Sequence, residues 1–230
     1  MLRRSTEHTP GSPILRNARP IDPRLLVRTP QSGMSLLLAK GTPAAPRLTR
    51  QRRSVLKVKR ALDVIFSALA LIALAPVLVL LAMALLVAQG RPVFVGRRRL
   101  GLNGKPFLLR DFRTRDDAGP TPIGTLLRNA GLDALPQLFN ILVGDMSFVG
   151  PEAHAPKIMA AGMRYEALVP YYRMRLAVRP GLVGWAQING HTGPVRDAGS
   201  ARARIDHDVA YIQNVSPLLD ARIVIQTLRH

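Results

Sequence analysis

The sequence predicts a mostly helical α+β protein: a disordered arm, a membrane helix broken at proline, and a small globular domain with short strands and interfacial amphipathic helices. Three observations support this fold class. Residues 64–90 carry no charged side chain. Residues 1–50 are dominated by Pro, Arg, Ser and Thr, a composition typical of disorder. The rest of the chain mixes short apolar stretches with Gly-rich turns and longer helical patterns. We therefore expect an arm over residues 1–50 and a domain over residues 51–230.

The first part of the chain is strongly basic. Residues 1–60 hold fourteen Lys or Arg and two acidic residues, a net charge of +12 out of +19. Such a charge predicts a polyanionic partner, and the neighbouring apolar segment favours an anionic lipid membrane. No nucleic-acid partner is expected, because the aromatic residues do not interleave with the basic clusters. The absence of cysteine excludes disulfides and thiolate chemistry, and the five histidines lack the spacing of a zinc site.

The apolar segment is basic at both ends and has Pro76 at its middle. Lys and Arg favour the cytoplasmic side of a membrane, so a simple crossing would place one basic cluster on the wrong face. A segment that enters, bends at Pro76 and returns avoids this conflict. We predict a re-entrant helix–break–helix hairpin over about residues 61–90. A spanning helix with a proline kink and a buried helical pair are the alternatives.

The domain that follows, residues 91–230, is expected to lie in the cytoplasm. Two short strands are predicted within 91–115, around a turn at 101–104. A helix is predicted from 121, followed by a second that opens near Leu132 and by a loop over 144–152. The remaining predictions are a surface helix over 154–177, a Gly-rich loop over 178–193, and one or two helices over 200–229. Asp133 and Pro136 would occupy the first turn of the helix near Leu132, where acids and proline are favoured.

From about residue 59 to residue 227 the chain resembles the bacterial sugar transferase family. These are monotopic polyprenyl-phosphate phosphoglycosyl transferases that start exopolysaccharide and O-antigen assembly. The matching stretches include Lys59-Arg-Ala-Leu-Asp63, Arg99-Leu-Gly-Leu-Asn-Gly-Lys-Pro-Phe107, Phe112-Arg-Thr114, Leu132-Asp133, Leu135-Pro-Gln137, Gly144-Asp-Met-Ser147, Val149-Gly-Pro151, Arg179-Pro-Gly181 and Gly184-Trp-Ala-Gln187. Each stretch is weak alone, but their order behind a proline-broken apolar segment is specific.

The resemblance implies a site and a reaction. A phospho-sugar would move from a UDP-sugar to undecaprenyl phosphate at the cytoplasmic face of the bacterial inner membrane. Asp133 matches the attacking Asp, and a carboxylate at a helix N-terminus would stay ionised. Arg113, Arg128 and Arg179 are the expected phosphate contacts, and Gln187 is a candidate for the nucleotide-sugar pocket. A Mg²⁺ ion would be held by Asp133 and Asp145.

Three departures from the family pattern leave a second interpretation open. The Glu that follows the attacking Asp is Ala134, the Arg of Gly-Pro-Arg-Pro is Glu152, and the Lys before Phe-Arg is Asp111. Asp145 or Glu152 could replace the lost metal ligand. Alternatively, the chain is a catalytically silent relative that regulates or joins a polysaccharide assembly complex.

Overall fold

The computed structural model describes residues 50–195 and 197–229, so the predicted arm, Arg50 apart, lies outside the described residues. The helices are α2 (Arg50–Gln89), α3 (Pro122–Asn129), α4 (Gln137–Val143), α5 (Tyr165–Leu168), α6 (Trp185–Ile188), α7 (Ala198–Asn214) and α8 (Pro217–Leu228), with 3-10 turns η3 (Leu102–Gly104), η4 (Leu132–Ala134) and η5 (Tyr172–Ala177). The strands are β1 (Phe94–Leu100), β2 (Pro106–Phe112), β3 (Arg115–Asp116), β4 (Gly119–Pro120), β5 (Ser147–Val149), β6 (Met159–Ala160), β7 (Met163–Arg164) and β8 (Gly181–Val183). This mostly helical content with short strands confirms the coarse fold class.

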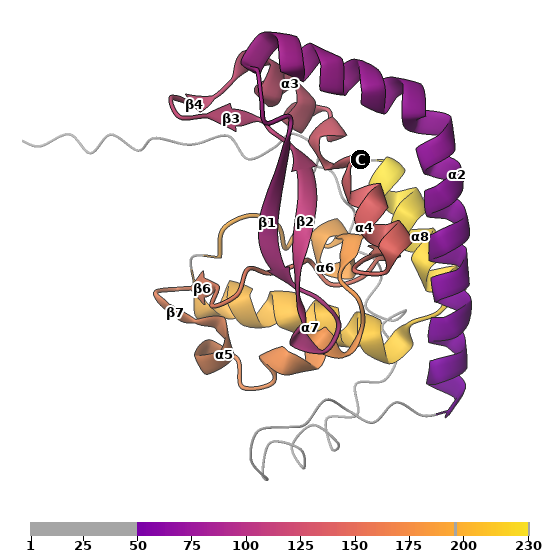
Figure 1. Ribbon diagram of the computed structural model, residues 1–230. Coiled ribbons are helices and arrows are strands. Elements are labelled where there is room, and N and C mark those ends of the chain that lie inside the picture. Colours follow the sequence, from indigo (N-terminus) through magenta and orange to yellow (C-terminus); the bar gives the residue numbers. More distant parts are fainter. Residues whose placement is uncertain (1–49, 196, 230) are drawn as a thin grey trace, which may run out of the picture.

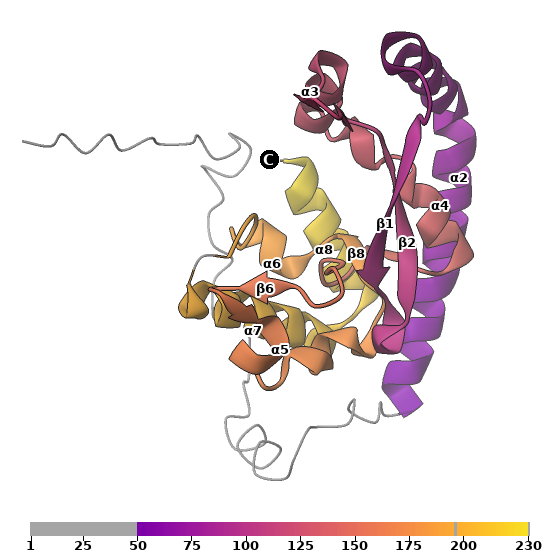
Figure 2. The ribbon, with the colours of Figure 1, turned by 60° about the vertical axis from the view of Figure 1, so that its left-hand side comes forward.

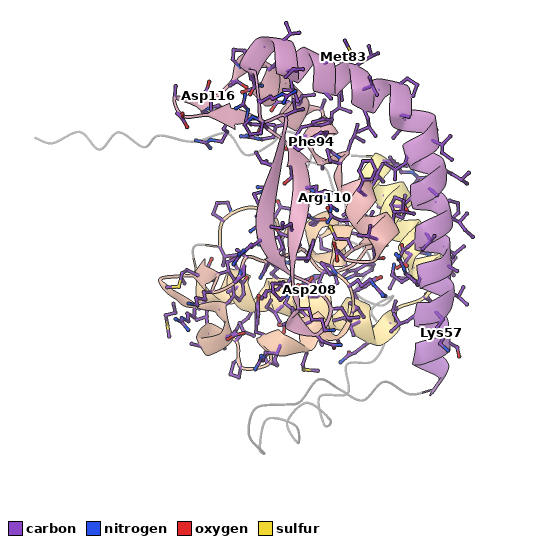
Figure 3. All side chains as sticks on the ribbon, in the orientation of Figure 1. Lys57, Met83, Phe94, Arg110, Asp116 and Asp208 are labelled. Carbon is purple, nitrogen blue, oxygen red and sulfur yellow. The ribbon has the colours of Figure 1, made fainter. Side chains whose placement is uncertain are left out.

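Helix α2 forms an arched wall along one side and over the top of the domain (Figure 1). Its stretch from Ser54 to Gln89 is long and apolar enough, by length and composition, to cross a membrane. The predicted break at Pro76 is wrong in detail, because the helix continues through this residue, and α2 as a whole is arched (Figure 1). Lys57 lies on one limb and Met83 on the other, and the limbs do not fold back against each other (Figure 3). A missing N–H bends a helix without ending it when both flanking turns keep their own hydrogen bonds.

The first limb of α2 is fixed to the domain by polar contacts. Lys59 Nζ donates to Asp220 Oδ2 on α8 at 2.6 Å, and the Phe148 N–H donates to Asp63 Oδ1 at 3.1 Å. Arg60 donates to the last carbonyls of α4, those of Ile141 at 2.6 Å and Leu142 at 2.8 Å. Lys59 and Arg60 therefore make contacts within the fold, although the basic charge before the apolar segment was expected to face anionic lipid.

The predicted strands within 91–115 are confirmed as the antiparallel hairpin of β1 and β2, paired from Phe94 with Phe112 to Leu100 with Pro106. The turn needs left-handed backbone, which Asn103 (φ 56°) and Gly104 (φ 76°) supply. The rings of Phe94 and Phe112 stack with centroids 5.2 Å apart. The hairpin stands between α2 and the region of α5 to α7 (Figure 2), so it links the membrane-type helix to the rest of the domain.

The prediction of a single helix over 154–177 is wrong. It folds as the β6–β7 hairpin, the single turn α5 and the 3-10 turn η5. Its backbone reverses at Ala161 (φ 49°) and Gly162 (φ 77°), which a helix does not allow. Arg175, expected on a bilayer surface, is buried and donates through Nε to Asp208 Oδ2 at 2.8 Å. Tyr165, Val169 and Tyr172 of this segment belong to a tyrosine-rich core against α7, whereas Met159 and Met163 are exposed.

The two predicted loops, 144–152 and 178–193, pair through the short parallel strands β5 and β8. Their backbones pass so closely that a Cβ on Gly181 would lie 2.1 Å from the Gly150 nitrogen. Three-residue strands of this kind leave no alternation for a sequence pattern to reveal. The predicted C-terminal helices are confirmed as α7 and α8, which begin at the side-chain caps Asp197 and Ser216.

Candidate active site

A cleft of about 760 Å³ opens between the β1–β2 hairpin and the segment that joins α3 to α4. Its lining is basic. Four arginines and two acids contribute, together with Pro194 from the loop before α7: the charged residues are Arg97, Arg113, Arg115, Arg128, Asp111 and Asp133. A cleft with this excess of guanidinium groups suits a substrate that carries phosphates.

Asp133 lies half-buried in the cleft on the 3-10 turn η4. The chain enters this turn through Gly131, whose φ of 68° is left-handed and suits glycine. Burial raises the pKa of Asp133, the negative charge of Asp111 raises it further, and Arg128 and Arg97 oppose both effects. The helix predicted to open near Leu132 is the 3-10 turn η4, and α4 begins only at Gln137, so Asp133 does not lie in the first turn of an α-helix.

Asp111 is the site residue that the sequence analysis did not assign. It is buried at the end of β2, where Arg97 Nε donates to its Oδ2 at 2.9 Å and Gln137 Nε2 donates to its Oδ1 at 2.7 Å. The pairing of the two hairpin strands contains the signal that could have identified Asp111. Val95 pairs with Asp111 and Arg97 pairs with Leu109, so Arg97 and Asp111 share one face of the hairpin.

Arg128 and Arg113, two of the three predicted phosphate contacts, both line the cleft, in different ways. Arg128 is exposed at the end of α3, and its Nη2 donates to Thr114 Oγ1 at 2.6 Å. Arg113 turns its guanidinium to the C-terminus of α2, where it donates to the carbonyl oxygens of Gln89, of Gly90 at 3.1 Å and of Arg91 at 3.3 Å. A cation is favoured at a helix C-terminus. Arg113 thus joins the cleft to the end of the apolar helix.

The remaining predicted residues lie outside this cleft. Arg179 lines a separate pocket beside the first limb of α2 and donates through Nε to the Gly144 carbonyl at 2.7 Å; burial and the charge of Arg60 lower its pKa. Gln187 Oε1 accepts from the Gly184 N–H at 2.7 Å, which caps α6. Asp145 lines a third pocket and accepts from Asn140 Nδ2 at 3.2 Å.

A Mg²⁺ ion would find two carboxylates in the cleft, those of Asp133 and Asp111. Within the described ranges no group of three or more His, Asp or Glu side chains is arranged to hold a metal. Mg²⁺ is commonly bound by one or two carboxylates completed by waters and substrate phosphates, a requirement that Asp133 can meet, whereas both oxygens of Asp111 already accept hydrogen bonds from Arg97 and Gln137. Of the two predicted replacement ligands, Asp145 lies elsewhere and Glu152 is ion-paired with Arg204 at 3.4 Å.

The fold and the cleft define a class of protein that presents a carboxylate and several arginines beside a long apolar helix. Within that class, the chain belongs to the bacterial sugar transferase family, whose model matches residues 54–230. The exopolysaccharide production protein PSS of Rhizobium leguminosarum bv. phaseoli is 40% identical over 188 residues, which cover 75% of this chain and 94% of PSS.

Two longer relatives carry names that state an activity. The UDP-glucose:undecaprenyl-phosphate glucose-1-phosphate transferase of Xanthomonas campestris pv. campestris is 37% identical over 180 residues, 72% of this chain and 37% of the relative. The protein of the same name from Escherichia coli (strain K12) is 34% identical over 203 residues, 82% of this chain and 43% of the relative. The chain therefore spans less than half the length of these two transferases.

Proposed function

We propose that the protein transfers a phospho-sugar from a UDP-sugar to undecaprenyl phosphate, the first step in assembling an exopolysaccharide or lipopolysaccharide-type glycan. The single observation that carries this proposal is the position of Asp133, a half-buried carboxylate with a raised pKa in a cleft lined by arginines. A carboxylate in this setting can attack a phosphate that the surrounding guanidinium groups neutralise. Family membership and the named activities of the relatives support the same reaction.

The proposed chemistry has two displacements at one phosphorus atom. In the first, an oxygen of Asp133 forms a bond to the phosphorus attached to the sugar, the bond to UMP breaks, and UMP leaves with its electron pair. In the second, an oxygen of undecaprenyl phosphate attacks the same phosphorus and the bond to Asp133 breaks. The products are the undecaprenyl-diphosphate sugar and the original carboxylate. The raised pKa makes the Asp133 oxygen more basic and hence a better nucleophile.

The arginines of the cleft have separate tasks in this proposal. Arg128 and Arg115 are exposed in the cleft lining and can reach an entering diphosphate. Arg97 holds Asp111 in place, and Arg113 holds the cleft against the end of α2. Asp133 would hold a Mg²⁺ ion, which would supply positive charge to neutralise the phosphates. Arg179, Gln187 and Asp145 would then support the fold around the site.

The proposed setting is the cytoplasmic face of the bacterial inner membrane, with α2 re-entrant. Both limbs of α2 pack on the same globular domain. On the first limb Lys59 pairs with Asp220, and on the second limb Leu85 is buried in a cluster with Phe112 and Leu127. A polar domain cannot lie on both sides of a bilayer, so this packing favours re-entry over a crossing. The other faces of α2 expose large apolar side chains that suit lipid, among them Ile65, Leu69, Ile72, Leu80 and Val87.

The proposal is tested with the full chain in detergent, incubated with UDP-sugars, undecaprenyl phosphate and Mg²⁺. We expect release of UMP, and we expect Asp133→Asn to abolish it while Asp145→Asn retains most of it, because Asp145 lies outside the cleft. Release that persists in Asp133→Asn would exclude this residue as the nucleophile. No release from any UDP-sugar would favour the catalytically silent alternative, which the loss of Glu at Ala134 motivates.

A further inference from the structure

The loop over residues 190–195, which precedes α7, contributes Pro194 to one wall of the cleft and is held by contacts outside the cleft. Pro194 lies in the lining with Asp133, whereas the flanking residues Thr192 and Gly193 are exposed. The loop reverses at Gly190 (φ 84°) and Gly193 (φ 75°), where the backbone is left-handed. Exposed segments with little packing of their own move readily unless particular contacts hold them. The position of the Pro194 wall therefore depends on a small number of contacts.

The charged side chain among these contacts is that of Arg204, a buried residue of α7. Its Nη2 donates to the Gly193 carbonyl oxygen at 2.7 Å, immediately before Pro194 in the chain. Its Nη1 donates to Glu152 Oε2 at 3.4 Å. A charge-assisted hydrogen bond is about twice as strong as a neutral one, and the side chain of Arg204 is only 7% exposed, so solvent screens it little.

Glu152 therefore has a structural role in this arrangement, as the partner of Arg204. It stands where the family pattern has Arg, but its charge is directed at Arg204, and it is not part of the cleft lining. Without Glu152, the buried guanidinium of Arg204 would lose a neighbouring negative charge. An Arg at position 152 would face Arg204 as a like charge. Glu152, which departs from the family pattern, thus pairs with the same Arg204 side chain that binds the loop at the Gly193 carbonyl.

We infer that Arg204, neutralised by Glu152, is the positioning residue that holds the 190–195 loop as the wall against which the nucleoside part of the donor packs. The inference rests on the proposed function. The less buried apolar residues of the lining, Val95 on the hairpin and Pro194 on the loop, suit a base, whereas the arginines suit the diphosphate. The chemical class recognised by the loop is therefore the nucleoside, and the phosphates are recognised by the cleft.

Amide hydrogen exchange of the full chain in detergent tests this inference without requiring turnover. We expect UMP to slow exchange in residues 190–195, and we expect inorganic pyrophosphate, which lacks a base, to leave it unchanged. Arg204→Gln should speed exchange of this segment about tenfold, the equivalent of one lost charged hydrogen bond, and should abolish the protection by UMP. Arg202→Gln is the matched control, because Arg202 is exposed on the same helix, and it should change neither result.

Kinetics supply the second measurement. We expect Arg204→Gln to raise KM for the UDP-sugar about tenfold with kcat little changed, and Glu152→Gln to act in the same direction more weakly. Glu152→Gln keeps the inference testable if Arg204→Gln does not fold, because Glu152 is partly exposed. Equal protection by pyrophosphate, or exchange in 190–195 that neither variant alters, would overturn the inference. UMP protection without any turnover would refute the proposed reaction and leave the loop assignment standing.

Discussion

Replacing Lys59 by Met should break the ion pair that attaches α2 to the domain, and should lower the thermal stability of the protein. The Lys59 and Asp220 side chains are 9% and 15% exposed, and their 2.6 Å contact is reinforced by the Tyr211 hydroxyl, which donates to Asp220 Oδ1 at 2.7 Å. Methionine fills a similar volume but leaves the Asp220 carboxylate buried without its cation. Breaking one partner of a buried pair costs about 3–5 kcal/mol. For a chain of this size we expect Tm to fall by about 10 °C.

The assay is thermal unfolding in detergent, with Lys57→Met as the control, because Lys57 is exposed two residues earlier on the same helix. Adding Asp220→Asn to Lys59→Met should recover part of the loss. Burial already raises the pKa of Asp220 and Lys59 opposes the rise, so without Lys59 the pKa rises further. A raised carboxyl pKa favours the folded state at low pH, so the deficit should shrink as the pH falls toward about 4. Equal Tm values for the Lys57 and Lys59 variants would refute this reasoning.

Three other predictions concern the cleft and the core. Asp111→Asn should lower the pKa of Asp133 by removing a neighbouring negative charge, so the acid limb of the pH profile of kcat/KM should move to lower pH. Burial holds the pKa of His154 well below its usual range, so the protein should lose stability as the pH falls below about 6.5, and His154→Phe should flatten this loss in denaturant unfolding at pH 5 and 7. Gly181→Ala places a methyl group 2.1 Å from the backbone nitrogen across the β5–β8 pair and should cost about 3 kcal/mol, whereas Gly96→Ala meets only ordinary contacts, the nearest at 3.7 Å.

The elements that the sequence predicted well are those with a local cause. The β1–β2 hairpin has its own left-handed turn residues, and α7 and α8 begin at the capping side chains of Asp197 and Ser216. The segment over 154–177 was predicted as a helix because its apolar and basic residues alternate at suitable intervals. The structure instead buries Arg175 against Asp208, a contact between residues 33 positions apart. No local pattern contains that pairing.

The residues predicted for the candidate site also fall into two groups: those that line the cleft and those that the structure places outside it. Asp133, Arg113 and Arg128 were found from the sequence and line one cleft. Arg179, Gln187 and Asp145 were named from the same family pattern, yet their hydrogen bonds secure a carbonyl, a helix cap and an asparagine outside the cleft. A motif records which residues matter and leaves open whether they serve the site or the fold around it.

By itself, the sequence determined the apolar segment with its proline, the family, and the aspartate on which the proposed reaction depends. Each of these can be recognised from motifs and their order along the chain. Only the tertiary structure decided that Asp111 lines the same cleft as Asp133, that Lys59 and Arg60 secure α2 to the domain, and that Glu152 is paired with Arg204. The physical reason is that charges interact through space. The partner of a buried charge is set by the packing that brings distant segments together, and residue order along the chain does not contain that distance.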